Sequence, residues 1–203
     1  MDLYLFDFDK TLYGYDFHRR LPALSLATGV SQYDLASKWW AAGYEARAES
    51  GEWPDADAYL EKFAEITGAT LTIAEWQDAR LQAMSRIEGS VAALRRASEL
   101  GTVSLLTNNP SIFVESLPRL APDVAAIVGA HLVTSCSLHA RKPAAEAYER
   151  ALTRFGAEPQ NTFFTDDNAV NIAAAAALGI HAHHFTSPES LQLAIADFAG
   201  RPQ

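Results

Sequence analysis

Short apolar runs that alternate with helical patterns are the feature that most constrains the fold of this chain. Five runs are long enough for a strand and too short for a helix: residues 3–6, 102–107, 130–135, 161–165 and 181–185. Helical patterns lie between the later runs and reach a glycine that suits a helix end: residues 91–100, 144–156 and 171–179. This alternation predicts an α/β fold, a Rossmann-like parallel sheet with helices on both faces.

One long interval interrupts the alternation. Between residues 15 and 87 we find no strand pattern, and the apolar spacing instead predicts helices near residues 18–28, 31–50, 55–68 and 72–87. Ser31 and Thr72 suit helix N-caps, and Gly51 and Gly68 suit helix ends. We therefore expect a core domain of residues 1–14 and 88–203, and an inserted four-helix cap domain of residues 15–87.

Charge and cysteine content narrow the class of protein. The 203 residues include 16 basic and 25 acidic side chains, a formal net charge of −9 that argues against a general nucleic-acid binder. Cys136 is the single cysteine, so an internal disulfide and a thiolate zinc cluster are excluded. The N-terminal residues do not resemble a signal peptide, and no segment has the roughly 18 apolar residues of a membrane helix. We expect a cytoplasmic protein that contacts neither membrane nor nucleic acid polymer.

Carboxylates follow the first apolar run directly. Asp7 and Asp9 stand two residues apart, so in an extended segment both face one volume while Phe8 packs the other way. Ligands of open parallel sheets bind beyond the carboxyl ends of the strands. Both aspartates are therefore expected at a ligand site.

Other polar residues follow the other runs. Thr107 ends one run and Asn108 follows it, Asp166 and Asp167 directly follow another, and Lys142 precedes the helix near residue 144. Carboxylates beside a cation and amide donors suit Mg²⁺ together with a phosphate group. The sequence thus predicts a metal and phosphate site, with Mg²⁺ as the cofactor and a small-molecule phosphate ester as the ligand.

The motifs DFDKTL, TNN, RKP and DDNAVN, in this order, resemble those of the haloacid dehalogenase (HAD) superfamily of hydrolases. The resemblance covers residues 7–172, and the insert after the first motif resembles the helical cap of one subfamily. It implies that Asp7 is a nucleophile that forms an aspartyl-phosphate. It also implies that Asp9 is the general acid and base, with a backbone carbonyl on the metal.

The remaining motifs imply further roles. Thr107 and Asn108 would hold the phosphoryl oxygens, and Lys142 would counter the charge on the nucleophile and the transferring group. Asp167 would be the direct metal ligand, and Asp166 would act directly or through water. These assignments make catalytic residues of Asp7, Asp9 and Lys142.

Asp9 favours phosphoryl transfer, because dehalogenases of the superfamily lack an aspartate at that place. The resemblance therefore implies a Mg²⁺-dependent phosphatase acting on a small phosphomonoester, such as a sugar phosphate or a nucleotide. A phosphomutase, a haloacid dehalogenase and a non-catalytic phosphate-binding protein remain open alternatives. The sequence predicts neither the natural substrate nor the oligomeric state.

Histidines and aromatic residues carry weaker signals. His181, His183 and His184 are interpreted as part of an edge strand rather than as a metal site. The tryptophans of the insert are expected to pack its helices, at residues 39, 40, 53 and 76. One residue of the run 18–20 could reach the substrate from the cap.

Overall fold

The core of the molecule is a parallel sheet. In a computed structural model that describes residues 2–201, four strands lie in the order β4 (Thr102–Leu105), β1 (Leu3–Phe6), β5 (Thr162–Asp166) and β6 (His181–His184). Every neighbouring pair is parallel, and Leu3 lies opposite both Thr102 and Thr162. The predicted Rossmann-like sheet is confirmed, with the apolar run of residues 3–6 as a central strand.

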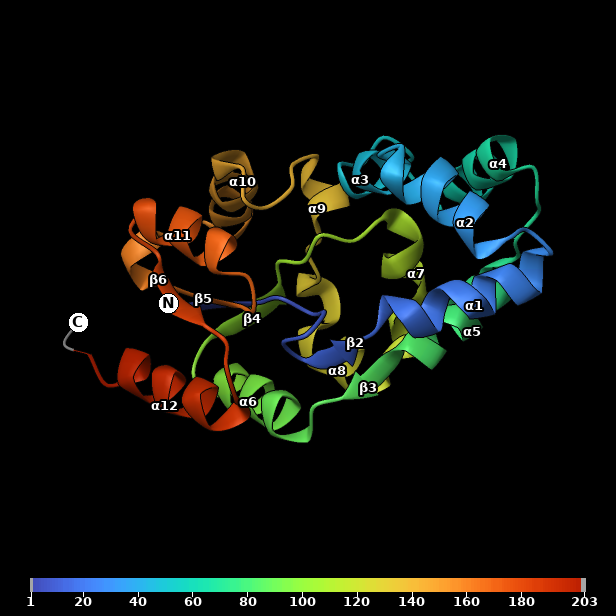
Figure 1. Cartoon of the computed structure of the whole chain (residues 1–203). Coiled ribbons are helices and arrows are strands. Elements are labelled where there is room, and N and C mark those ends of the chain that lie inside the picture. Colours follow the sequence, from blue (N-terminus) through green and yellow to red (C-terminus); the bar gives the residue numbers. More distant parts are fainter. Residues whose placement is uncertain (1, 202–203) are drawn as a thin grey trace.

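Helices cover both faces of this sheet (Figure 1). On one side lie α6 (Glu88–Ser98), α8 (Pro122–Val128) and α12 (Pro188–Ala199), and on the other lie α10 (Ala145–Phe155) and α11 (Ala169–Ala177). Alternate residues of β1 face opposite sides: Tyr4 and Phe6 join one hydrophobic cluster, and Leu3 and Leu5 join the other. Burial on both faces explains why this strand is a continuous apolar run.

The strand predicted at residues 130–135 is wrong. This segment begins in the 3-10 helix η2 (Gly129–His131) and makes one isolated bridge, between Thr134 and Thr107. Thr134 then caps the helix α9 (Ser135–Leu138) in a reciprocal arrangement with Ser137. Side-chain capping therefore turns the backbone into a helix before a ladder with β4 can extend.

The interval between the first motif and residue 87 is mainly helical, as predicted. Its elements are α1 (Phe17–Thr28), α2 (Gln32–Leu35), the π-helix η1 (Ala36–Ala41), α3 (Tyr44–Glu49), α4 (Ala56–Thr67) and α5 (Ile73–Ala83). The continuous helix expected at residues 31–50 is wrong, because Gly43 adopts a left-handed conformation (φ 82°) that separates η1 from α3. Ser31 and Thr72 are N-caps and Gly68 is a C-cap, as predicted. We call residues 17–83 the helical insert.

A short β-ribbon lies at the root of the helical insert. Strands β2 (Tyr13–Tyr15) and β3 (Met84–Arg86) pair in antiparallel fashion, with Tyr13 opposite Arg86. The prediction of no strand between residues 15 and 87 is therefore wrong for β3. Three-residue strands are too short for a periodic signal, and they pair only because the insert returns the chain to its starting point.

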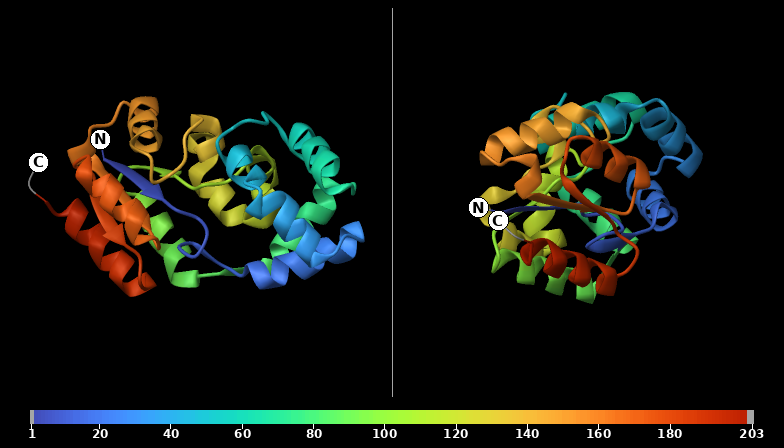
Figure 2. Two further views of the ribbon diagram at one scale, coloured as in Figure 1. Left: turned by 45° about the horizontal axis from the view of Figure 1, so that its top comes forward. Right: turned by 90° about the vertical axis from the view of Figure 1, so that its left-hand side faces the viewer.

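The helical insert rests on the core through α7 (Ser111–Leu120) (Figures 1 and 2). One hydrophobic cluster runs through both parts and includes Trp39 and Trp76 of the insert together with Phe8 and Phe113 of the core. No helix of residues 2–201 is long and apolar enough to cross a membrane. The shared cluster fixes the insert over the carboxyl ends of the strands.

Candidate active site

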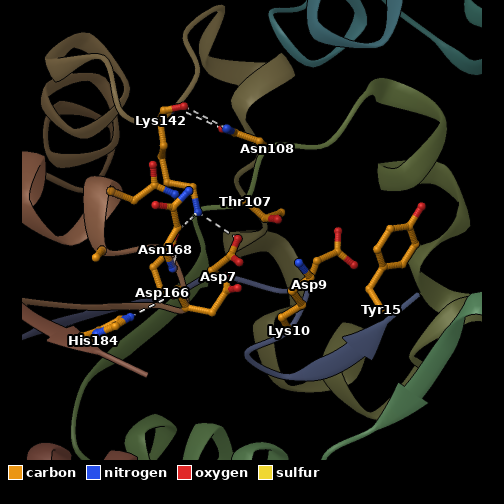
Figure 3. Close-up of a pocket in the computed structure, with 13 residues that line it drawn as sticks. Asp7, Asp9, Lys10, Tyr15, Thr107, Asn108, Lys142, Asp166, Asn168 and His184 are labelled. Carbon is orange, nitrogen blue, oxygen red and sulfur yellow. Dashed lines mark hydrogen bonds and ion pairs between the residues drawn. The ribbon is translucent and has the colours of Figure 1, made fainter. Parts of the chain in front are cut away.

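A polar cavity of about 540 Å³ lies at the carboxyl ends of β1 and β5 (Figure 3). Every residue predicted for the site lines it: Asp7, Asp9, Thr107, Asn108, Lys142, Asp166 and Asp167. The lining also includes Lys10, Tyr15, Asn168, Ala169, Asn171 and His184. Phe8 points away and is fully buried, stacked on Tyr13 at 5.0 Å between ring centroids. The alternation expected for residues 7–9 is therefore present.

Lys142 joins two of the buried carboxylates (Figure 3). Its Nζ donates to Asp7 Oδ1 at 2.8 Å and to Asp166 Oδ2 at 2.5 Å, and its side chain is 2% exposed. Burial lowers the pKa of Lys142, but the Asp7 and Asp166 carboxylates outweigh this effect and raise it overall. The ammonium therefore stays charged between the two acids.

Burial is also the main influence on Asp7. It raises the pKa of the Asp7 carboxyl to about 7; Lys142 opposes this shift, and the carboxylates of Asp166 and Asp9 add to it. Buried carboxyl groups with raised pKa values are common at functional sites. A cation bound beside them offsets both the cost of burying the charge and the repulsion between the carboxylates.

Three carboxylates are close enough to share one cation. Ligand atoms of Asp7, Asp166 and Asp167 lie within 4.8 Å of one another. Asp166 also accepts hydrogen bonds from Asn171 Nδ2 at 2.9 Å and from the Asn168 amide at 2.8 Å, which fix its orientation. The pKa of Asp167 is raised, mainly by burial and secondly by repulsion from the Asp166 carboxylate. An all-oxygen set of this kind fits a hard divalent cation such as Mg²⁺.

The Asp9 carboxylate has a different partner. Nη2 of Arg80, from α5 of the helical insert, lies 2.6 Å from both Asp9 carboxylate oxygens. Asp9 itself sits in a tight loop in which Lys10 adopts a left-handed conformation (φ 62°). The Asp9 side chain thus lies in the same cavity as Asp7 but at the side of the insert.

The Asn108 side chain mainly orders the backbone segment that carries Lys142. Its Nδ2 donates to the Lys142 carbonyl at 2.9 Å, and its Oδ1 accepts from the Lys142 amide at 3.0 Å (Figure 3). Both ends of the side chain are thus engaged with the segment that carries Lys142. The neighbouring Asn109 contacts Thr107 Oγ1 at 2.9 Å and Asp9 Oδ2 at 3.3 Å through Nδ2.

Sequence reasoning missed Arg80, Asn109 and His184. Arg80 lies in a helix that shows no motif, and Asn109 is the last residue of the TNN motif, to which the sequence assigned no role. His184 lines the cavity, and its Nε2 lies 2.9 Å from the Asp167 carbonyl oxygen. The position of His184 at the end of a strand, in the same place as Asp7 and Asp166, was the available signal.

The run 18–20 does not reach the cavity lining. His18 and Arg19 are exposed, whereas Arg20 is buried, donates to the Tyr15 hydroxyl at 3.0 Å and lies over the Trp76 ring. Arg20 therefore supports Tyr15, which does line the cavity.

A Rossmann-like sheet with carboxylates and a buried lysine gathered beyond its strand ends is the framework of an α/β enzyme. The family comparison makes this specific. The chain belongs to the haloacid dehalogenase-like hydrolases, whose family model matches residues 1–179.

Solved structures share this fold at low sequence identity. A predicted HAD-like family hydrolase from Porphyromonas gingivalis is 19% identical with a TM-score of 0.80, over 100% of this chain and 99% of that one. A HAD family enzyme from Bacteroides thetaiotaomicron, in complex with magnesium and inorganic phosphate, is 19% identical with a TM-score of 0.75, over 92% and 95%. An L-2-haloacid dehalogenase is 20% identical with a TM-score of 0.58, over 94% and 87%.

Proposed function

We propose that this hydrolase is a Mg²⁺-dependent phosphatase that acts on a small phosphomonoester through an aspartyl-phosphate intermediate. The observation that carries the proposal is the arrangement around Asp7. Its buried carboxylate lies 2.8 Å from Lys142 Nζ and forms a cluster of three carboxylates with Asp166 and Asp167. Asp9 lines the same cavity. A nucleophile, a countercharge, a metal set and a second acid are thus available in one place.

In the first step, an Asp7 oxygen attacks phosphorus, and the bond between phosphorus and the alcohol oxygen breaks. Asp9 donates its proton to that oxygen, so the alcohol leaves neutral. In the second step, water attacks the phosphorus of the aspartyl-phosphate and gives its proton to Asp9. The bond between Asp7 and phosphorus breaks, which releases inorganic phosphate and restores both aspartates.

Lys142 stabilises the negative charge on Asp7 and on the transferring group throughout. Thr107 would hold phosphoryl oxygens, and Asn108 would contribute by fixing the Lys142 segment in addition to its expected phosphate role. Asp7, Asp166, Asp167 and the Asp9 carbonyl would hold Mg²⁺. When bound, this ion supplies positive charge that offsets the charge of the phosphate oxygens.

The helical insert would act as a cap domain, with residues 15–87 as cap and residues 1–14 and 88–203 as core. Its position over the strand ends favours small substrates, such as sugar phosphates or nucleotides, and excludes bulky polymers. Magnesium and inorganic phosphate in the Bacteroides thetaiotaomicron structure support the choice of metal and of substrate class.

Hydrolysis of an aryl phosphate tests the proposal. We expect turnover with Mg²⁺, loss of turnover with EDTA, and loss with Asp7→Asn. Halide release from a haloacid without phosphatase activity would instead identify a dehalogenase. A requirement for a sugar bisphosphate would identify a phosphomutase, and phosphate binding without turnover of any ester would identify a binding protein.

A further inference from the structure

The helical insert contributes a charged side chain directly to the candidate catalytic carboxylates. Arg80 in α5 is 3% exposed, and its Nη2 lies 2.6 Å from Oδ1 and from Oδ2 of Asp9. The two residues are 71 positions apart in the sequence. The contact therefore exists only when α5 lies against the loop that carries Asp9.

The guanidinium of Arg80 is held firmly in place. Its central carbon lies 4.3 Å from the centroid of the Tyr15 ring and 5.5 Å from that of Phe113. The helix that carries it is anchored to α7, because Gln77 Nε2 donates to Ser116 Oγ at 3.0 Å and Arg119 donates to Asp78 at 2.6 Å. The position of the guanidinium thus follows the position of the insert on the core.

Asp9 is held from the core as well. The side-chain Nδ2 of Asn109 donates to Asp9 Oδ2 at 3.3 Å, and the backbone N–H of Asn109 donates to Ser135 Oγ at 3.1 Å. The Asp9 carboxylate is therefore hydrogen-bonded on one side to the Asn109 side chain of the core and on the other to the Arg80 guanidinium of the insert. Without Arg80, the weaker of these two contacts would be left to orient it.

Stability alone does not account for a buried arginine at this place. A buried ion pair contributes little net stability, because the loss of hydration offsets much of the attraction. In addition, Arg80 uses only Nη2 for its hydrogen bonds, and within residues 2–201 its buried Nε has no partner. A pair retained at such a cost is better explained by what it does to Asp9.

We propose that Arg80 is a positioning residue for Asp9. With the insert seated on the core, one Asp9 oxygen keeps its contact with Arg80, and this contact fixes the direction of the carboxyl group. The other oxygen carries the proton and transfers it to the leaving alcohol oxygen. This role rests on the proposed phosphatase function and adds to it a dependence of proton transfer on the helical insert. A displacement of about 1 Å in such a group can slow a reaction about 100-fold.

Leaving groups of different basicity separate this role from a structural one. An aryl oxygen such as p-nitrophenolate leaves without much help from an acid, whereas an alkyl oxygen needs the proton. For Arg80→Gln we expect kcat/KM to fall by about 100-fold with an alkyl phosphate and by less than about 3-fold with p-nitrophenyl phosphate. Arg80→Lys should recover part of the loss, because it restores a cation near Asp9.

A double variant tests whether Arg80 acts through Asp9. In the Asp9→Asn background, Arg80→Gln should change kcat/KM for the alkyl phosphate by less than about 3-fold, since the group to be positioned is already disabled. Arg47→Gln is the matched control. It removes another arginine ion pair of the helical insert, the exposed one with Glu52, outside the cavity lining and away from α5 and α7, and should leave the leaving-group dependence unchanged.

Several results would overturn the role. An equal loss with both leaving groups would indicate a general structural effect, and a loss confined to esters with an anionic alcohol part would make Arg80 a substrate-binding residue. A gain in rate would show that the ion pair obstructs Asp9. Additive effects of the two substitutions would show that Arg80 does not act through Asp9.

Wild-type protein that turns over no phosphate ester refutes the phosphatase function, and with it this role. Activity with an unchanged leaving-group dependence in Arg80→Gln refutes the role alone.

Discussion

Lys142 Nζ and Asp166 Oδ2 lie 2.5 Å apart at the centre of the carboxylate-rich cavity, and the same ammonium contacts Asp7. All three side chains are almost completely buried. A single positive charge thus balances part of the negative charge that the ends of β1 and β5 bring together. The stability of this region and the proposed chemistry depend on the same lysine.

Replacement of Lys142 by methionine should lower both stability and activity. The free energy of unfolding should fall by about 3 kcal/mol, because one partner of a buried ion pair is removed and the acids remain. Phosphatase activity should fall at least about 100-fold, since the countercharge on the reacting group is lost. Urea denaturation and steady-state kinetics measure the two effects.

Lys62→Ala is the control for this substitution. Lys62 makes an ion pair with Glu65 at the surface of the insert, so its loss should cost less than about 1 kcal/mol. A Lys142→Met protein as stable as the wild type would contradict the importance of the buried charge balance.

Magnesium should stabilise the folded protein by binding to the carboxylate cluster of Asp7, Asp166 and Asp167. An ion that binds only the folded state at 100 times its Kd adds about 2.7 kcal/mol to the free energy of unfolding. Asp167→Asn should lose most of this Mg²⁺-dependent increase, because a ligand of the set is neutralised. Thermal unfolding with Mg²⁺ and with EDTA measures the difference.

Asp197→Asn, on the exposed side of α12, is the matched loss of one carboxylate away from the site and should retain the full Mg²⁺ effect. An equal Mg²⁺ effect in Asp167→Asn and in the wild type would place the ion elsewhere.

Glu49 should make the stability of the protein depend on pH. Burial raises the pKa of its carboxyl to about 7, and the nearby Glu45 adds to this shift, although Arg141 of the core lies 2.6 Å away and opposes it. Between the ordinary carboxyl pKa and about pH 7, the folded state holds a proton that the unfolded state has lost. The free energy of unfolding therefore decreases as pH rises through this range.

Glu49→Gln should weaken this decrease, as followed by urea denaturation between pH 4.5 and pH 7.5 at roughly half-unit steps. The decrease should not vanish, because the raised pKa of Asp7 acts in the same direction. Glu61→Gln, an exposed carboxyl of the same insert, should leave the profile unchanged. A Glu49→Gln profile identical to that of the wild type would contradict the pKa shift.

Local patterns accounted for most of the fold. The runs at residues 3–6 and 181–185 became strands because each is apolar or β-compatible over the length of one strand. Ser31, Thr72 and Gly68 marked helix ends correctly, since capping depends on side chains within one helical turn. The run 130–135 failed because the capping of α9 by Thr134 competed with strand pairing.

The sequence by itself determined the sheet, the helical insert and the gathering of polar residues at the strand ends, because a parallel sheet brings the ends of its strands to one edge. Only the tertiary structure decided which of these residues touch one another. The pairing of Arg80 with Asp9 and the bracing of Lys142 by Asn108 join residues 71 and 34 positions apart. Such contacts depend on how the insert and the loops pack, and no periodicity along the chain encodes that packing.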